Sequence, residues 1–165
     1  MGEKHTLSCL VENQFGVLAR VSSLISARGF NIDSLTVSAT EDPSVSRMTI
    51  VVDADAVKLE QVKNQLNRLV DVIEVQELKE GDFIDRESLL VRVAANGRSR
   101  DELSKLIEAY GGRIADATDE SVVIEAMGDT KRLDAFVDAL RPLGIQQLVR
   151  AGRVAMARRS VKSSE

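Results

Sequence analysis

The sequence predicts an α+β fold of two tandem ferredoxin-like plaits, each with the element order βαββαβ, and three observations lead to it. Short stretches such as residues 5–11 and 46–53 alternate between apolar and polar side chains, which is typical of half-buried strands. Between them, apolar side chains recur every three or four positions, as in amphipathic helices. This order of elements starts again after a charge-rich segment near residue 80. The two halves share their pattern but not their residues.

The first half has clear strand and helix boundaries. A strand over 5–11 leads into a helix over 16–28, which the helix-stop residue Gly29 ends. Strands are expected over 31–40, 46–53 and 72–78, and Asp55 is placed to cap a second helix. The four strands would form one antiparallel sheet with both helices on one face.

The domain boundaries follow from composition. Residues 1–79 form the first domain, the charge-rich segment 80–87 reads as a linker, and 88–158 form a second, similar domain. Its strands are expected over 89–93, 113–117, 121–127 and 145–151, and residues 159–165 form a basic flexible tail. Because each core is thin, the free face of each sheet favours a homodimer or domain pairing.

Bulk properties exclude several classes of protein. The 165 residues carry a net charge of −4 and only 3% aromatic side chains, which argues against nucleic-acid binding. No apolar run reaches the roughly 18 residues that a membrane helix needs, and the first residues lack the apolar core of a signal peptide, so we expect a cytoplasmic protein without a membrane segment.

The sequence offers no catalytic site and no metal site. It has one Cys and one His, too few for a Cys/His metal cluster, and no Ser/His/Asp group, Cys–His pair or P-loop. A small phosphatase of the same fold is an alternative, but it would need an arginine in the first loop, which this loop lacks. We therefore expect no catalytic residues, no metal and no cofactor in this chain.

The loop between the first strand and the first helix is the candidate binding site. Backbone amides near Gly16, Val17 and Leu18 begin the helix and lack partners within it, so they suit a small anion such as a carboxylate. Asn31, at the start of the second strand, offers donor and acceptor together for an amino acid. The alternative is purely structural, because Asn and Gly also occur wherever a turn is needed.

Several ordered motifs resemble a known family. The segment ENQFGVLARV at 12–21 looks like the opening of an ACT domain, an amino-acid-sensing plait. RGFNIDSLTV at 28–37, DP at 42–43, SRMTI at 46–50 and LVDV at 69–72 narrow the resemblance to the regulatory small subunits of acetolactate synthase (acetohydroxyacid synthase). The resemblance covers the whole chain and is weaker in the second half.

The resemblance implies a non-catalytic partner of a thiamine-diphosphate enzyme in valine, leucine and isoleucine synthesis. That catalytic large subunit condenses pyruvate with a second 2-oxo acid and is expected to hold thiamine diphosphate, Mg and FAD. The small subunit would raise its activity and transmit feedback inhibition by valine or another branched-chain amino acid.

In such a homodimer the effector lies between two ACT domains. One protomer would contribute Asn13, Gly16, Val17 and Leu18, and the other Asn31 and Ile32. Phe15 departs from the small residue often found before that glycine. The rival interpretation is a free-standing amino-acid-sensing ACT protein that regulates another enzyme or a transcription factor.

Overall fold

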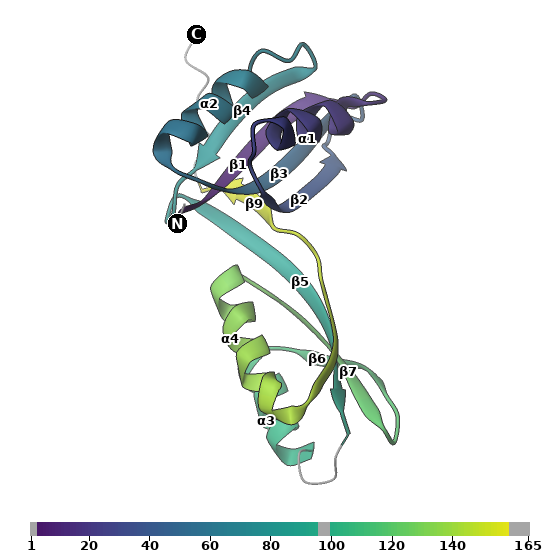
Figure 1. Ribbon diagram of the computed structural model, residues 1–165. Coiled ribbons are helices and arrows are strands. Elements are labelled where there is room, and N and C mark those ends of the chain that lie inside the picture. Colours follow the sequence, from purple (N-terminus) through teal and green to yellow (C-terminus); the bar gives the residue numbers. More distant parts are fainter. Residues whose placement is uncertain (1–2, 96–99, 159–165) are drawn as a thin grey trace. The chain divides into compact units, whose positions relative to one another are not determined.

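A computed structural model describes residues 3–95 and 100–158 of the chain, and the fold divides into two compact units (Figure 1). Unit 1 consists of Met1–Ile84 together with Arg153–Glu165, and unit 2 consists of Asp85–Gly152. In each unit four strands pair antiparallel, and counted along the chain within the unit they lie in the order second, third, first, fourth. These are two ferredoxin-like plaits, so the predicted fold class is confirmed.

Unit 1 follows the predicted order of elements closely. They are β1 (Glu3–Glu12), α1 (Val17–Ala27), β2 (Ile32–Ala39), β3 (Val45–Ala54), α2 (Ala56–Leu66) and β4 (Val72–Leu78). The side chain of Asp55 caps α2 by accepting a hydrogen bond from the amide of Lys58, as its position in the sequence suggests.

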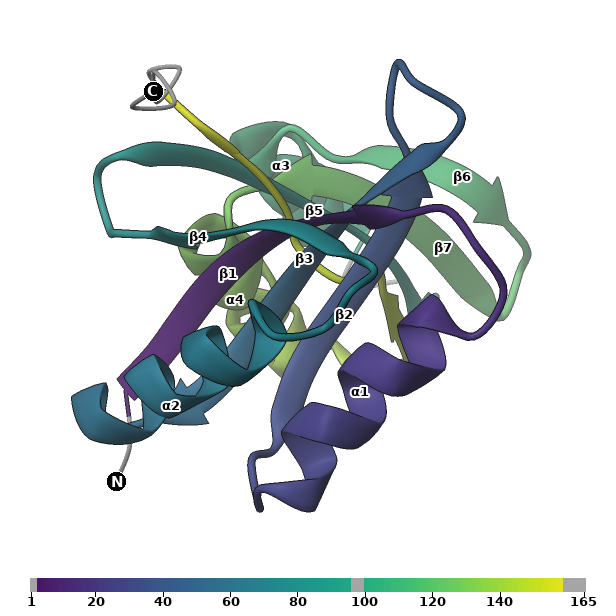
Figure 2. The ribbon, with the colours of Figure 1, turned by 90° about the horizontal axis from the view of Figure 1, so that it is seen from above.

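Both helices of unit 1 cover the same face of its sheet (Figure 2). On that face Leu7 of β1 lies opposite Ile50 of β3, and all three of the apolar side chains Leu7, Cys9 and Val11 are buried. The amphipathic stripes of the helices pack onto them through Val17, Val21 and Ile25 of α1 and Leu59, Val62 and Leu66 of α2. The core of unit 1 therefore lies between one sheet face and the two helices.

The opposite face of this sheet is covered by the end of the chain. Thr6, Ser8, Thr49 and Val51 point away from the helices, yet each is at most 4% exposed. The guanidinium of Arg153 donates to the Thr6 hydroxyl at 2.7 Å. Its backbone amide and carbonyl bond the hydroxyls of Ser34 and Thr36 at 3.2 and 2.7 Å.

This segment was expected to lie in the second domain, after the last strand. Instead it contains a short strand, β9 (Val154–Ala157), that pairs with β5 (Phe83–Ala94), and its Ala155 is buried. The expected flexible tail over 159–165 lies outside the described residues.

Unit 2 repeats the arrangement with its own core. Its elements are β5 (Phe83–Ala94), α3 (Arg100–Tyr110), β6 (Arg113–Ala117), β7 (Ser121–Gly128), α4 (Thr130–Leu140), a 3₁₀ turn (Arg141–Leu143) and β8 (Ile145–Arg150). The core is built from Leu89, Val91 and Val93 of β5, Ile124 of β7 and Phe136 of α4, with Tyr110 stacked on Phe136 at 4.9 Å between ring centroids.

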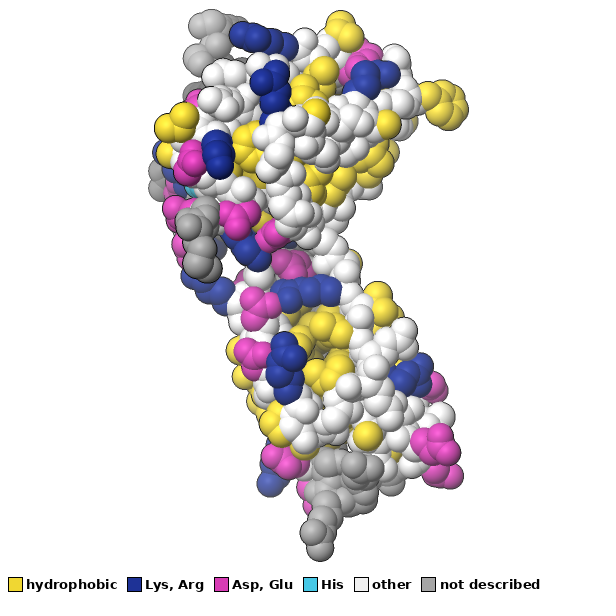
Figure 3. Space-filling view, in the orientation of Figure 1, with side chains coloured by type: hydrophobic (Ala, Val, Ile, Leu, Met, Phe, Trp, Pro, Cys, Tyr) yellow, Lys and Arg dark blue, Asp and Glu magenta, His cyan; other side chains and the backbone are white. Residues whose placement is uncertain are grey.

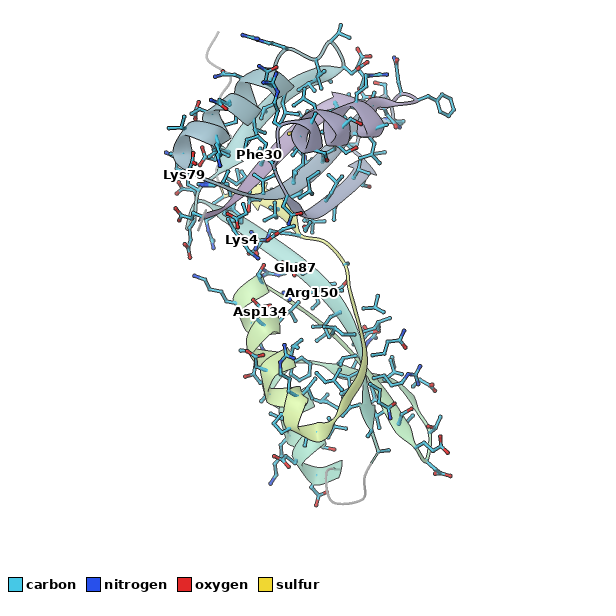
Figure 4. The ribbon with its side chains drawn as sticks, viewed as in Figure 1. Lys4, Phe30, Lys79, Glu87, Asp134 and Arg150 are labelled. Carbon is cyan, nitrogen blue, oxygen red and sulfur yellow. The ribbon has the colours of Figure 1, made fainter. Side chains whose placement is uncertain are left out.

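The expected linker over 80–87 is largely strand, because β5 begins at Phe83. One of its charges is structural: Glu87 is 9% exposed, and its carboxylate accepts a 2.5 Å hydrogen bond from Arg150. Arg150 also donates to Asp134 at 2.5 Å, and Glu87, Asp134 and Arg150 are labelled in Figure 4. The Thr130 hydroxyl donates to Glu87 as well. A run of charges therefore resembled a solvated linker although one of them is buried and paired.

Candidate functional site

The loop between β1 and α1 is held in a defined conformation. Gly16 has φ +82°, the left-handed region that favours glycine, and it directly precedes α1. Asn13 fastens the loop to the turn between β2 and β3. Its backbone amide donates to the carbonyl of Ser44 at 2.7 Å, and its side-chain amide donates to the carbonyl of Pro43 at 2.9 Å. The loop and that turn therefore lie at the same end of the sheet.

The first turn of α1 presents unused donors. The carbonyl of Gly16 accepts from the amide of Arg20, and the amide of Val17 makes a long bond of 3.4 Å to Gln14. Within the described residues the amides of Leu18 and Ala19 have no hydrogen-bond acceptor, no side chain caps the helix, and its first turn holds no acidic residue. Such a turn carries the positive end of the helix dipole and can bind an anion.

The side chains around this turn differ in their access to solvent. Val17 is 2% exposed and belongs to the core, so only its backbone is available to a ligand. Leu18 is 42% exposed, and Phe15 is fully exposed. The turn thus combines free amides with apolar side chains, which together suit a small molecule that has a carboxylate and an aliphatic part.

Arg20 and Asp71 support the loop and were missed by the sequence analysis. Nε of Arg20 lies 2.7 Å from Oδ2 of Asp71, and the Asp71 carbonyl accepts the amide of Glu12 at 2.8 Å. A Cβ atom built on Gly16 would meet Nη1 of Arg20 at 3.0 Å, so the guanidinium lies against the glycine. The sequence feature that could have indicated Arg20 is its spacing of four from Gly16, which puts both residues on one side of the first turn.

Asn31 and Ile32 lie at the other end of α1. The helix has 11 residues, so its ends are about 16 Å apart at 1.5 Å per residue. Asn31 is exposed, and its amide bonds Asp33 at 3.3 Å, while Ile32 is half-buried against the core of unit 1. Within one chain the structure therefore brings Asn13, Gly16, Val17 and Leu18 together but keeps Asn31 and Ile32 away from them.

Other chemistry is limited in the part of the chain that the structure describes. No group of three or more His, Cys, Asp or Glu residues there could hold a metal ion. Burial raises the pKa of the Cys9 thiol to about 12, which leaves it protonated and unreactive near neutral pH. None of the helices described is long and apolar enough to cross a membrane.

Comparisons with known proteins extend over both units. A family profile described as an AHAS small subunit-like ACT domain matches residues 7–74, and one described as the small subunit of acetolactate synthase matches residues 86–159.

Similar proteins carry the same description over most of their length. A probable acetolactate synthase small subunit of Archaeoglobus fulgidus is 47% identical over 96% of this chain and 99% of its own. The acetolactate synthase small subunit of Mycolicibacterium smegmatis is 44% identical over 93% of this chain and 91% of its own. The crystal structure of the small subunit from Thermotoga maritima superposes with a TM-score of 0.86 at 34% identity, covering 96% and 99% of the two chains. The chain therefore belongs to the acetolactate synthase small-subunit family.

Proposed function

We propose that this chain is the regulatory subunit of a cytoplasmic acetolactate synthase. It activates the catalytic large subunit and makes it sensitive to feedback inhibition by valine or another branched-chain amino acid. Similarity over nearly the full length to proteins named as small subunits supports the proposal that the partner is the catalytic large subunit. Thiamine diphosphate, Mg and FAD belong to the catalytic chain in this proposal.

The observation that carries effector binding is the first turn of α1. The carboxylate of an amino acid would accept hydrogen bonds from the amides of Leu18 and Ala19, and the guanidinium of Arg20, which lies against Gly16, places a positive charge beside this turn. The exposed Leu18 side chain beside these amides offers an apolar contact to a branched aliphatic side chain.

Two copies of unit 1 would complete the site. β2 is the outer strand of its sheet, so one edge of its backbone is available for pairing. If two β2 strands pair antiparallel around a twofold axis, the start of β2 in one copy meets the end of β2 in the other. That end leads to the Pro43–Ser44 turn, to which the Asn13 loop is fastened. Asn31 and Ile32 of one copy would therefore lie near Asn13 and Gly16 of its partner.

An effector at such an interface can act at a distance. It changes the activity of the complex only if it binds one arrangement of the two copies more tightly than another. The catalytic subunit would then respond to the arrangement of the dimer, without contact with the amino acid itself.

The test is reconstitution from purified chains. The small subunit alone should not consume pyruvate, should raise the rate of the catalytic chain when mixed with it, and should confer inhibition on addition of valine. Pyruvate turnover by the small subunit alone, or failure to bind and activate the catalytic chain, would contradict the proposal. The second outcome, together with retained amino-acid binding, would favour a free-standing sensor.

A further inference from the structure

An open hollow lined by polar residues lies on the helical side of unit 1, between the end of α1 and the outer stripe of α2. It encloses about 350 Å³, at the lower end of the range for small-molecule sites. It is lined by the side chains of Arg28, Gln61, Asn64, Gln65 and Arg68. The lining thus holds two guanidinium groups, three carboxamides and no carboxylate.

The two arginines stand apart from the others of the chain. Among arginines whose side chains the structure describes, Arg28 and Arg68 are those that make no side-chain hydrogen bond or ion pair within the protein. Both line the same hollow. Basic side chains are visible on this part of unit 1 in Figure 3.

The helices explain why cations occur here but not why their donors are unused. Arg28 directly follows α1, and Arg68 lies just beyond the end of α2, so each is attracted by the negative end of its helix dipole. The helix dipole favours a positive charge at these positions, but it supplies no hydrogen-bond acceptor for the guanidinium N–H groups. Glu60, which is the acidic residue within α2, does not fill the need, because it pairs with Lys63 at 2.6 Å.

The lining defines the chemistry of the ligand. A guanidinium offers paired N–H donors that match two oxygens of a phosphate or carboxylate. Carboxamides donate and accept, so they suit the remaining oxygens or neutral polar groups of the same molecule. We propose that this hollow binds a small anion with at least two anionic oxygen groups, with a phosphate or diphosphate as the preferred head group. Within one chain it is separate from the amino-acid turn, because Gly16 and Arg28 flank opposite ends of α1.

The test uses the full-length protein and inorganic pyrophosphate as the probe. Calorimetric titration at constant ionic strength should show saturable binding. Arg28→Gln and Arg68→Gln should each weaken it by roughly fivefold, and the double variant by roughly 25-fold if the effects add, as expected for exposed charged pairs. The matched control is Lys58→Gln, which removes the same charge from an exposed side chain of α2 outside the hollow and should change the affinity by less than about twofold.

Four outcomes would overturn the proposal. Pyrophosphate could fail to bind the wild type, or Lys58→Gln could weaken binding as much as Arg68→Gln, which would indicate a general charge effect. The arginine variants could instead change the oligomeric state in light scattering while pyrophosphate does not bind, which would assign the hollow to an acidic surface of another chain. Valine titration of the same variants should remain as in the wild type, and a parallel loss of valine binding would assign the hollow to the amino-acid site.

Discussion

The guanidinium of Arg20 and the carboxylate of Asp71 meet at 2.7 Å although the two residues are 51 positions apart. Asp71 is 7% exposed, and its backbone carbonyl also accepts the amide of Glu12 at the end of β1. The pair therefore joins the segment before β4 to the first turn of α1, and it holds the Arg20 guanidinium beside Gly16.

Asp71→Asn should destabilise unit 1 and disturb the loop. Neutralising the buried partner leaves Arg20 without its charge partner, at a cost of about 1–2 kcal/mol in the free energy of unfolding. Urea denaturation measures this loss. The control is Glu125→Gln, which neutralises the partner of the 78% exposed Arg113 in unit 2 and should change the free energy of unfolding much less. Equal losses in the two variants would show that the Arg20–Asp71 pair has no special role.

Substitution of Gly16 tests whether an amino acid binds at the first turn of α1. The positive φ of Gly16 determines which control variant is needed. Any side chain at φ +82° brings strain, so Gly16→Asp alone would confuse strain with charge. Gly16→Asn has nearly the same shape without the charge and carries a similar strain. We expect Gly16→Asp to weaken valine inhibition by at least about tenfold relative to Gly16→Asn, because its carboxylate competes with the ligand's for the same donors.

Enzyme rate against valine concentration, with circular dichroism to confirm folding, measures that comparison. Asn31→Ala should also weaken inhibition, though less, because it removes contacts without adding repulsion. If Gly16→Asp is folded and responds to valine as Gly16→Asn does, the effector does not bind at this turn.

Arg153→Ala should weaken unit 1 although it lies near the end of the chain. It removes the donor to the buried Thr6 hydroxyl, a loss of about 1–2 kcal/mol in the free energy of unfolding. Arg158→Ala is the control: its guanidinium bonds only the exposed Gly81 carbonyl among the contacts described, so its loss should be smaller. Hydrogen exchange of β1 and β2 localises the effect, and unchanged protection in Arg153→Ala would contradict this role.

The buried thiol of Cys9 gives stability a defined dependence on pH. Burial raises its pKa from 9.0 to about 12 in the folded state, so between these values the folded chain holds a proton that the unfolded chain has lost. Stability from this group is complete below pH 9 and falls above it, by about 1.4 kcal/mol per pH unit. Urea denaturation of the wild type and of Cys9→Ala from pH 8 to 10.5 measures this effect. The difference between the two free energies of unfolding cancels the contributions of the titratable groups that both proteins share. A constant difference would show that the thiol does not titrate in this way.

Local patterns sufficed where neighbouring residues determine the structure. The alternation of Leu7, Cys9 and Val11 and the stripe of Val21 and Ile25 indicated the sheet and the helix of unit 1, and both are confirmed. The choice of glycine at position 16 likewise indicated the turn before α1, where φ is positive.

Features that depend on distant partners were not predictable in this way. Nothing near Arg20 indicates Asp71, and nothing near Arg153 indicates Thr6, 147 positions away. Glu87 resembled a linker residue because charge alone reveals neither its burial nor its distant partner Arg150. The roles of Asn31 and Ile32 depend on a second copy of the chain and remain predictions.

The cover supplied by Arg153–Ala157 also affects the order of events during synthesis. Unit 1 encloses unit 2 in the sequence, so 68 residues, from Asp85 to Gly152, must be added before the segment that covers its sheet exists. At about 5–20 residues per second this takes roughly 3–14 s. Throughout that interval the hydroxyls of Thr6, Ser34 and Thr36 in the nascent sheet lack the hydrogen-bond partner that Arg153 provides. The part of the chain that is made first is therefore completed only after unit 2 has been made.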